Sequence, residues 1–393
     1  MSKDTYPQVS PSDTATSTLT AQTTEPFPDA ASVKAWIHST AIELGFGDCG
    51  FLSVHHPLFK KQIEQLKAWL AKGYEGQLEF MHNNHDLRAN PAQLVEGAKT
   101  IISVRMDYLT AAPQPRRVED NDRPNHAIIA RYARGRDYHK TMRGRLKTLA
   151  QRIEEMLPQW QHLNIEAHNP FVFRPFSDSA PIFERPIADA AGLGWTGKHT
   201  LLLNKQAGSF FVLGELFISL LLPEDEPVSP HCGSCSACID ICPTQAIIAP
   251  HELNAVACIS YLTIEHKGSI DIKYRRAIGN RVFGCDDCQL ICPWNRYANL
   301  SKIDDFQPRH RLDQITLMEL WQWEESSFLE ATQGSPLRRS GYLNFLRNIA
   351  IGLGNATPNT IVITALNARR GQHGEMLDEH IDWAIAEQQA KLQ

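Results

Sequence analysis

The stretch CGSCSACIDICP, residues 232–243, decides how the rest of the chain is interpreted. Its cysteines follow the spacing C-x2-C-x2-C-x3-C, and Pro243 comes directly after the last of them. Three cysteines on one tight loop can hold three irons of a cubane, whereas a fourth that is followed by proline turns away toward another cluster. The spacing is therefore typical of a [4Fe–4S] cluster that lies beside a second one.

A second, incomplete cysteine run follows and ends at Pro293. Val282 stands where its first cysteine would be, and Cys258, between the two runs, is the natural replacement. Zinc sites also use Cys-x2-Cys pairs, but they rarely repeat this longer pattern with its proline. In two-cluster ferredoxins the last cysteine of each run ligates the other cluster. We therefore predict one [4Fe–4S] cluster on Cys232, Cys235, Cys238 and Cys292, and another on Cys242, Cys258, Cys285 and Cys288.

The composition is that of a globular protein of several domains. The chain has 393 residues, of which 42% are hydrophobic and 21% charged, which excludes a disordered chain, a collagen and a small disulfide scaffold. Its longest apolar run, residues 210–222, contains Glu215 and is too short to cross a membrane, so we expect a buried core segment there. The net charge is −5, and a nucleic-acid partner would therefore need a local basic face.

Changes in composition divide the chain into four parts. Residues 1–30, rich in Thr, Ser and Pro, predict a disordered tail without an export signal, so we expect a cytoplasmic protein whose cysteines form no disulfides. Residues 31–222 mix helix and strand patterns and predict an α/β or α+β domain. Residues 223–300 predict a ferredoxin-like region with the two clusters. Residues 301–393 predict stacked helix pairs of a solenoid type, although no clear sequence repeat is present, and the family resemblance described below implies that they are HEAT-like. Short linkers favour a monomer. The leftover Cys49 is expected to be a buried structural thiol.

Hydrophobic periodicity predicts the individual elements. Residues 100–104 and 164–173 predict strands, and residues 111–126, with three prolines, predict a surface loop. Helices are predicted over residues 33–44, 58–70, 137–157, 317–323, 343–353, 360–369 and 377–388.

The segment from residue 131 to 152 carries eight Lys or Arg and a single acid, Asp137. This pattern suits either a solvated basic helix face or a face that contacts the phosphates of a nucleic acid. Asp137 precedes the predicted helix, where a carboxylate caps free amides, and it is also a candidate acid catalyst. Capping and nearby arginines lower the pKa of a carboxyl, whereas a proton donor needs a raised one. A catalytic Asp137 must therefore be desolvated, with its arginines directed elsewhere.

Three further patterns are less specific. Residues 192–197 spell GxGxxG, but a helical stretch precedes them and a strand-like run follows, which reverses the order of a dinucleotide-binding fingerprint. A tight turn, or a glycine loop beside a planar cofactor, is the better interpretation. Residues 174–181 suit a site-lining loop or a plain turn. Asp137 and His139 begin a D-x-H-x-x-G string typical of some cobalamin-binding mutases, but Met142 replaces the glycine, and no histidine ligand for cobalt is evident.

The longest motifs of the chain together resemble those of the epoxyqueuosine reductase family. The resemblance extends over roughly residues 31–390 and leaves out only the N-terminal tail. The motifs are RYARGRDYHK at 131–140, RPFSDSAP at 174–181, AGLGWTGKHTLLLN at 191–204, CGSCSACIDICPTQAI at 232–247, CISYLTIEHKG at 258–268 and GCDDCQLICPWNRYA at 284–298.

This resemblance implies a tRNA-modifying oxidoreductase. The family removes the epoxide oxygen of epoxyqueuosine, at the wobble position of certain tRNAs, to give queuosine, and consumes two electrons and protons while water is released. The two clusters relay electrons from an external low-potential donor to cobalamin, whose Co(I)-type form acts at the epoxide carbon. The aspartate of the RDYH motif, here Asp137, would donate a proton to the departing oxygen.

The resemblance also implies binding residues. The implied cobalamin contacts are Asp137, Asp178, Ser179, Ala190, Leu193 and Ser260. The implied tRNA contacts are Arg134, Arg136, Lys140, Arg143, Ile264 and Lys267.

Two other functions compete with this interpretation. A plain two-cluster electron-transfer module would carry electrons to a partner oxidoreductase, contain no corrinoid and need no acid at Asp137. A corrinoid enzyme similar to reductive dehalogenases would act on a small molecule, which needs no basic face, and such enzymes usually carry an export signal. The basic segment around Asp137 and the lack of such a signal favour the tRNA-modifying reductase.

Overall fold

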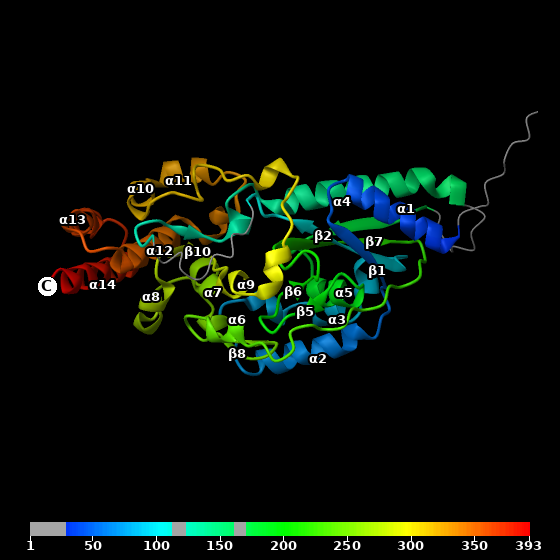
Figure 1. Ribbon diagram of the computed structural model, residues 1–393, viewed down its shortest axis with the longest axis horizontal. Coiled ribbons are helices and arrows are strands. Elements are labelled where there is room, and N and C mark those ends of the chain that lie inside the picture. Colours follow the sequence, from blue (N-terminus) through cyan, green and yellow to red (C-terminus); the bar gives the residue numbers. More distant parts are fainter. Residues whose placement is uncertain (1–28, 112–122, 161–169) are drawn as a thin grey trace, which may run out of the picture.

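The computed structural model describes residues 29–111, 123–160 and 170–393. An antiparallel sheet, with its strands in the order β1-β2-β7-β4, is the middle layer of the N-terminal part (Figure 1). Strand β2 pairs with β7 along its whole length, and β1 and β4 form the edges. The predicted strand at 100–104 and the predicted core run at 210–222 are thereby confirmed. The strands are β1 Asp48–Ser53, β2 Thr100–Asp107, β4 Phe173–Phe176 and β7 Phe211–Ile218.

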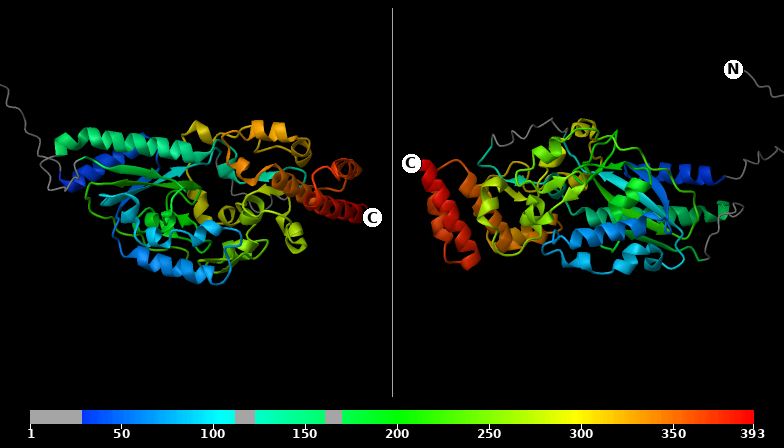
Figure 2. Two further views of the ribbon diagram at one scale, coloured as in Figure 1. Left: turned by 180° about the vertical axis from the view of Figure 1, so that it is seen from behind. Right: turned by 90° about the horizontal axis from the view of Figure 1, so that it is seen from below.

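Helices cover both faces of this sheet, as the views in Figures 1 and 2 agree. Side chains alternate between the faces of a strand, so Ile102 and Leu216 pack toward α1 and α4 while Ile101 and Phe217 pack toward α5. The sheet is thus buried on both sides. The helices of this part are α1 Ala30–Glu43, α2 Leu58–Leu70, α3 His85–Ala89, α4 Tyr138–Met156 and α5 Glu184–Ala190.

The helix predictions of this part are confirmed, and caps explain where the helices begin. Asp29 accepts a hydrogen bond from the amide of Ser32 before α1, and Asp137 accepts one from the amide of His139 before α4. The predicted tail lies outside the described residues except for its last two, and the loop and strand predicted at 111–126 and 164–173 lie largely outside them.

Short elements make up the cysteine region, because its cysteines and prolines interrupt regular structure. Its strand β10 runs parallel to β3, which belongs to the N-terminal part, so the two parts are joined by a ladder. All nine cysteines are free thiols, as expected. The short strands β3 Ile128–Ile129, β5 Trp195–Thr196 and β6 Leu202–Leu203 precede this region in the chain. The elements of the region itself are α6 Ala237–Asp240, β8 Ile247–Ala249, β9 Glu252–Leu253, α7 Ile259–Ile264, α8 Ile272–Ile278, β10 Arg281–Phe283 and α9 Asp287–Leu290.

The C-terminal helices lie at the end of the molecule opposite the sheet (Figures 1 and 2). They confirm the four predicted helices, and one hydrophobic core runs from β10 and α7 into them. The fold is α+β, as predicted, whereas the division into domains at residues 222 and 300 remains a prediction. No helix in the described ranges is long and apolar enough to span a membrane. The helices are α10 Leu317–Trp321, α11 Glu325–Ala331, α12 Tyr342–Asn355, α13 Thr360–Arg369 and α14 Glu375–Leu392.

Candidate active site

Two cavities divide the eight clustered cysteines into two quartets. The first has a volume of about 280 Å³, and the second, of about 400 Å³, extends beyond its cysteines toward the sheet. Both quartets combine cysteines from the two runs, as the crossover rule predicts. The first cavity is lined by Cys232, Cys235, Cys238 and Cys292, and the second by Cys242, Cys258, Cys285 and Cys288.

The chemistry of the quartets fits iron–sulfur clusters. Burial raises the pKa of Cys285 and Cys288 well above the ordinary thiol value, and it raises the pKa of Cys292 to about 11. Thiolates at such sites need the positive charge of a metal, and a cubane supplies it at each cysteine. Among the described residues, no three His, Cys, Asp or Glu side chains converge closely enough to hold a single ion, as a zinc site would require.

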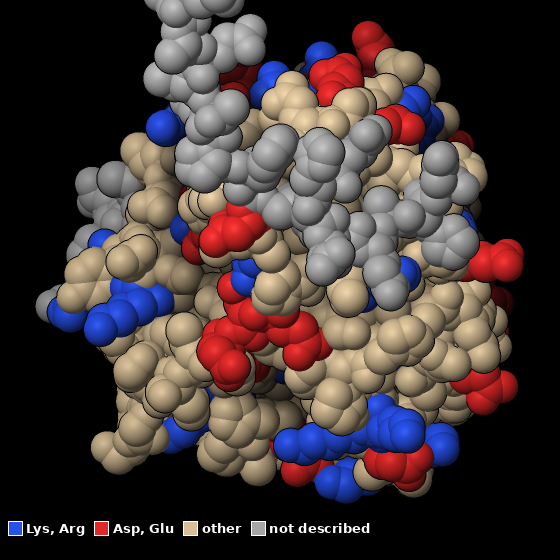
Figure 3. Space-filling model, turned by 90° about the vertical axis from the view of Figure 1, so that its right-hand side faces the viewer, with Lys and Arg blue, Asp and Glu red and all other residues tan. Residues whose placement is uncertain are grey.

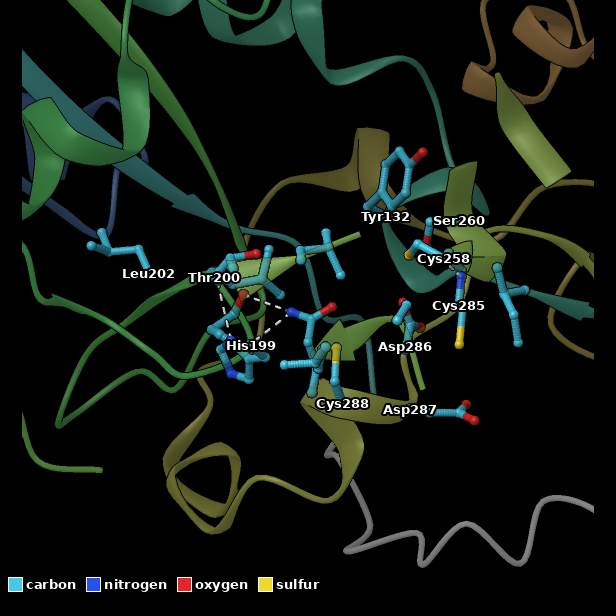
Figure 4. A pocket seen from close by; sticks show the side chains of 18 of the residues that line it. Tyr132, His199, Thr200, Leu202, Cys258, Ser260, Cys285, Asp286, Asp287 and Cys288 are labelled. Carbon is cyan, nitrogen blue, oxygen red and sulfur yellow. Dashed lines mark hydrogen bonds between the residues drawn. The ribbon is translucent and has the colours of Figure 1, made fainter. Parts of the chain in front are cut away.

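The second cavity continues from its cysteines into an aromatic and apolar chamber (Figure 4). Tyr108, Tyr132 and Tyr138 stand edge to face, with ring centroids 6.5 Å and 6.1 Å apart. Phe211 and Leu213 of strand β7 line the chamber as well. Burial raises the pKa of all three tyrosines, so their hydroxyls stay neutral. The chamber can therefore enclose a large planar group beside the second quartet.

Asp137 lies at the start of α4, one residue before the chamber wall at Tyr138. Its Oδ1 accepts hydrogen bonds from the amide of His139 at 3.0 Å and from His139 Nδ1 at 2.5 Å. The bond from the His139 ring holds the pKa of Asp137 below its ordinary value, although partial burial opposes it. The capping role foreseen from the sequence is confirmed. Arg136 pairs with Asp305 at 3.4 Å, but the charge of Arg143 also lowers the pKa of Asp137, so the expectation that the arginines are directed elsewhere is only partly met.

Three further acids lie beside Asp137. Tyr138 donates its hydroxyl to Asp178, and His139 Nε2 lies 3.6 Å from the same carboxylate. Glu184 accepts the Asp178 amide at 2.5 Å, and Glu215 is fully buried beneath them on strand β7. Burial, with the charge of Asp178, raises the pKa of Glu215 to about 8, and burial with the charge of Glu215 raises that of Glu184. Sequence reasoning treated Glu215 as core only, although a lone acid in an apolar run was the available signal.

The six residues predicted to contact cobalamin fall into three settings. Ser260 lines the chamber and accepts the amide of Cys285 at 3.1 Å. Asp178 and Ser179 line a neighbouring pocket of about 480 Å³, which shares Arg185 with the chamber. Two members lie away from both pockets, since Leu193 is 2% exposed and packs in the core, and Ala190 packs at its edge. Asp137 borders the chamber through Tyr138.

The six residues predicted to contact tRNA also differ in exposure. Arg136, Lys140 and Lys267 are exposed, and Arg143 is partly exposed. Arg134 donates Nε to the Ile129 carbonyl at 2.9 Å. Ile264 is 8% exposed, so its side chain faces the core rather than the solvent.

Comparison with known proteins shows which family has this sequence. The epoxyqueuosine reductase of Pseudomonas aeruginosa is 49% identical over 359 residues, which cover 91% of this chain and 95% of the relative. The chain belongs to the epoxyqueuosine reductase family. The family model described as "Epoxyqueuosine reductase QueG, DUF1730" matches residues 88–179, and the model described as "4Fe-4S double cluster binding domain" matches residues 231–295. This confirms the two iron–sulfur clusters, and similarity far beyond the cysteine region speaks against a plain electron-transfer module.

Solved structures of epoxyqueuosine reductases share the fold. One, with an epoxyqueuosine-modified tRNA-Tyr stem loop, has a TM-score of 0.77 at 24% identity, and the match covers 91% of each chain. Another, from Bacillus subtilis, has its catalytic aspartate loop swung out of the active site, with a TM-score of 0.75 at 25% identity over 91% of each chain. As an epoxyqueuosine reductase, the protein is an oxidoreductase that converts epoxyqueuosine to queuosine in tRNA, as the sequence predicted.

Proposed function

We propose that this epoxyqueuosine reductase passes electrons from an external low-potential donor through the first quartet and then the second to cobalamin in the chamber, where Asp137 protonates the departing epoxide oxygen. The observation that carries this proposal is that the second quartet and Tyr138, the neighbour of Asp137, line one cavity. The first quartet has a separate cavity and is the natural point at which electrons from outside arrive.

The chamber suits cobalamin by its chemistry. Its aromatic and apolar walls can cover a corrin face, and the neighbouring pocket with Asp178 and Ser179 offers polar groups to the amide-bearing rim of the ring. When bound, cobalamin supplies a cobalt centre of low potential that delivers electrons to the substrate carbon. Ser260 holds the Cys285 amide and thereby fixes the loop between the second cluster and the chamber. Neutral tyrosines exclude water from this wall without adding charge.

Asp137 supplies the proton that the epoxide oxygen needs. In the free enzyme its short contact with His139 favours the carboxylate, so Asp137 alone is a poor acid. A substrate base that covers Asp137 removes it from water, which raises the pKa of the carboxyl so that it takes up a proton from solvent as the site closes. The proton then passes to the oxygen as the C–O bond breaks, so that a neutral hydroxyl group forms instead of an alkoxide. The movable aspartate loop of the Bacillus subtilis relative supports such a rearrangement.

The tRNA is held by the exposed cations near Asp137. Arg136 and Lys140 are exposed and lie within three positions of Asp137 in the chain, and Lys267 lies on the loop after α7, where its Nζ donates to the Ser340 carbonyl at 3.1 Å. The end of the sheet part that faces away from the C-terminal helices has acidic side chains near the middle of its described surface (Figure 3). That acidic group would repel phosphates, whereas the exposed Arg136, Lys140 and Lys267 would attract them. We further propose that the protein acts as a cytoplasmic monomer.

The test uses the anaerobically purified chain supplied with cobalamin, a chemical reductant and epoxyqueuosine-bearing tRNA. We expect about eight iron atoms per chain, retained cobalt and queuosine in the nucleoside digest. Asp137→Asn should lower the rate of queuosine formation roughly 10²- to 10⁴-fold, the usual contribution of a general acid.

The matched control for this variant is Asp48→Asn. Asp48 also pairs with a histidine, His38, at 2.9 Å and accepts a backbone amide, but it lies on β1 away from the chamber. Its replacement should leave the rate within twofold or so, as for an ordinary surface change. Equal losses in both variants, or full activity of Asp137→Asn, would refute the role of Asp137. Full iron without retained cobalt would refute the cobalamin site.

A further inference from the structure

His199 is a buried histidine that the proposed mechanism does not use. It lies in the segment after the GxGxxG motif and is only 3% exposed. Its Nδ1 accepts a hydrogen bond from the amide of Leu201 at 3.1 Å, whereas its Nε2 has no hydrogen-bond partner among the described residues. Because Nδ1 accepts, a neutral ring carries its hydrogen on Nε2. Burial lowers the pKa of His199 to about 4, so the ring is neutral at physiological pH.

This unpaired donor borders both quartet cavities. His199 lines the cavity of the first quartet and also the wall of the second, on which Figure 4 labels it. A buried N–H without a partner costs free energy comparable to a lost hydrogen bond, so such groups in folded proteins mark an absent partner. The group that these cavities are built to hold, a cluster with its sulfide and thiolate sulfurs, is rich in acceptors.

The segment around His199 is anchored on the first quartet. Lys198 donates Nζ to the carbonyls of Gly233 and Cys235, at 2.7 Å and 2.8 Å, and so ties the backbone beside His199 to the loop that carries the first cysteines. The second quartet has no such tie to this lysine among the described contacts. Of the two clusters, the first is therefore the one to which His199 is held at a fixed position.

The glycine motif now has a structural explanation. Gly192 has a φ of +77°, which favours glycine, and a Cβ at Gly197 would lie 2.7 Å from Cε1 of His199 and from Cδ1 of Leu203. Glycine at this position leaves room for the imidazole, which a methyl group would displace. The motif thus packs a histidine next to a cluster loop, in line with its reversed order of helix and strand, and does not serve a dinucleotide.

We propose that His199 donates its Nε2 hydrogen to a sulfur of the cluster held by Cys232, Cys235, Cys238 and Cys292, and thereby raises the reduction potential of that cluster. This inference rests on the proposed assignment of the cluster ligands. Reduction adds negative charge to the cluster, so a hydrogen bond to a sulfur stabilises the reduced form more than the oxidised form. His199 thus tunes the potential of the first cluster and makes it easier for the external donor to reduce that cluster.

The test is an anaerobic redox titration of the purified holoprotein, followed by electron paramagnetic resonance. Replacing His199 by Leu removes the donor, and we expect the equilibrium constant for reducing the first cluster to fall about tenfold, a shift of about 59 mV for one electron. His199→Gln keeps an N–H near the Nε2 position and should recover most of the wild-type value. A Cys235→Ser variant identifies which signal belongs to the first cluster.

Two further variants keep the outcome interpretable. Gly197→Ala should displace the ring and shift the same potential in the same direction, even if His199→Leu assembles poorly. His251→Leu is the control, because His251 bonds the carbonyl of Gly197 at 3.1 Å but has a partner and is exposed. Unchanged potentials with full iron, or a shift confined to the second cluster, overturn the inference. Iron far below two clusters in the wild type instead overturns the proposed ligand assignment.

Discussion

Glu215 should make the stability of this protein depend on pH, and the variant Glu215→Gln should lack that dependence. The carboxyl is fully buried on β7, where Ser103 Oγ lies 3.3 Å from Oε1 and Oε2 has no partner among the described residues. Burial raises its pKa from 4.5 to about 8. Between pH 4.5 and pH 8, the folded protein holds a proton on this carboxyl that the unfolded chain has already released. Its contribution to stability is therefore fully present below pH 4.5 and is lost as the pH rises through 8.

The magnitude follows from the size of this shift. At 1.36 kcal/mol per pKa unit, the wild type should lose about 2 kcal/mol of unfolding free energy between pH 6 and pH 8 at this site. Glu215→Gln keeps the carbonyl that Ser103 reaches and removes the titration, so the variant should be about 2 kcal/mol more stable relative to wild type at pH 8 than at pH 6. At about 2–4 °C per kcal/mol, the difference in melting temperature should widen by about 4–8 °C.

The assay is thermal unfolding under nitrogen, with the clusters retained, at pH 6 and pH 8. Glu64→Gln is the matched control, because Glu64 is 70% exposed on α2 and its replacement should shift the melting temperature equally at both values of pH. The reasoning would be wrong if wild type and Glu215→Gln moved in parallel between the two conditions. Such parallel behaviour would mean that Glu215 is already ionised in the folded protein.

Three other predictions concern single side chains. Asp137→Ala should lower the unfolding free energy by about 1 kcal/mol through loss of the α4 cap, whereas Asp137→Asn should keep it, which urea denaturation can measure. Cys49, 6% exposed with a pKa raised by burial, should resist iodoacetamide in the folded protein and react once urea is added, as mass spectrometry would show. Arg347→Met should leave the carbonyls of Leu262, His266 and Gly268 unpaired and speed hydrogen exchange in residues 262–268; unchanged exchange would refute this.

Elements with a clear helical period were predicted from sequence almost residue by residue. Helices α2 and α13 begin and end where the apolar spacing places them, because a helix is stabilised largely by contacts along one face. The sheet was harder, since β7 is buried on both sides and its pattern does not alternate. The order β1-β2-β7-β4 depends on pairing between distant segments, of which β2 and β7 lie more than 100 residues apart, and no local pattern records such pairing.

The site was predicted where its chemistry requires fixed spacing, and missed where it depends on the fold. The double-cluster region could be predicted because a cubane demands a compact cysteine loop and a partner run, whereas the division of the cysteines between the clusters stays a prediction. Tyr108 and Tyr132 form the chamber wall, yet each stands alone in the sequence as an ordinary core aromatic. His199 likewise looks like part of a turn. The feature that distinguishes His199 is its unpaired Nε2. Such a donor can be recognised only once the burial and the hydrogen bonds of the ring are known.

Asp286 links the segment of the proposed proton donor, Asp137, to the loop that carries cysteines of the second quartet. It follows Cys285 in the chain and is 4% exposed, and its carboxylate accepts the amide and the guanidinium of Arg131 at 2.9 Å and 3.0 Å. Arg131 opens the segment that leads to Asp137, whose amide is fixed in turn by the Gly334 carbonyl. A buried ion pair with a shared backbone bond holds its partners in one geometry, and breaking it leaves an uncompensated charge. The position of the proposed proton donor is thus set in part from the loop of Cys285, so the two motifs form one structural unit although Arg131 and Asp286 are 155 positions apart.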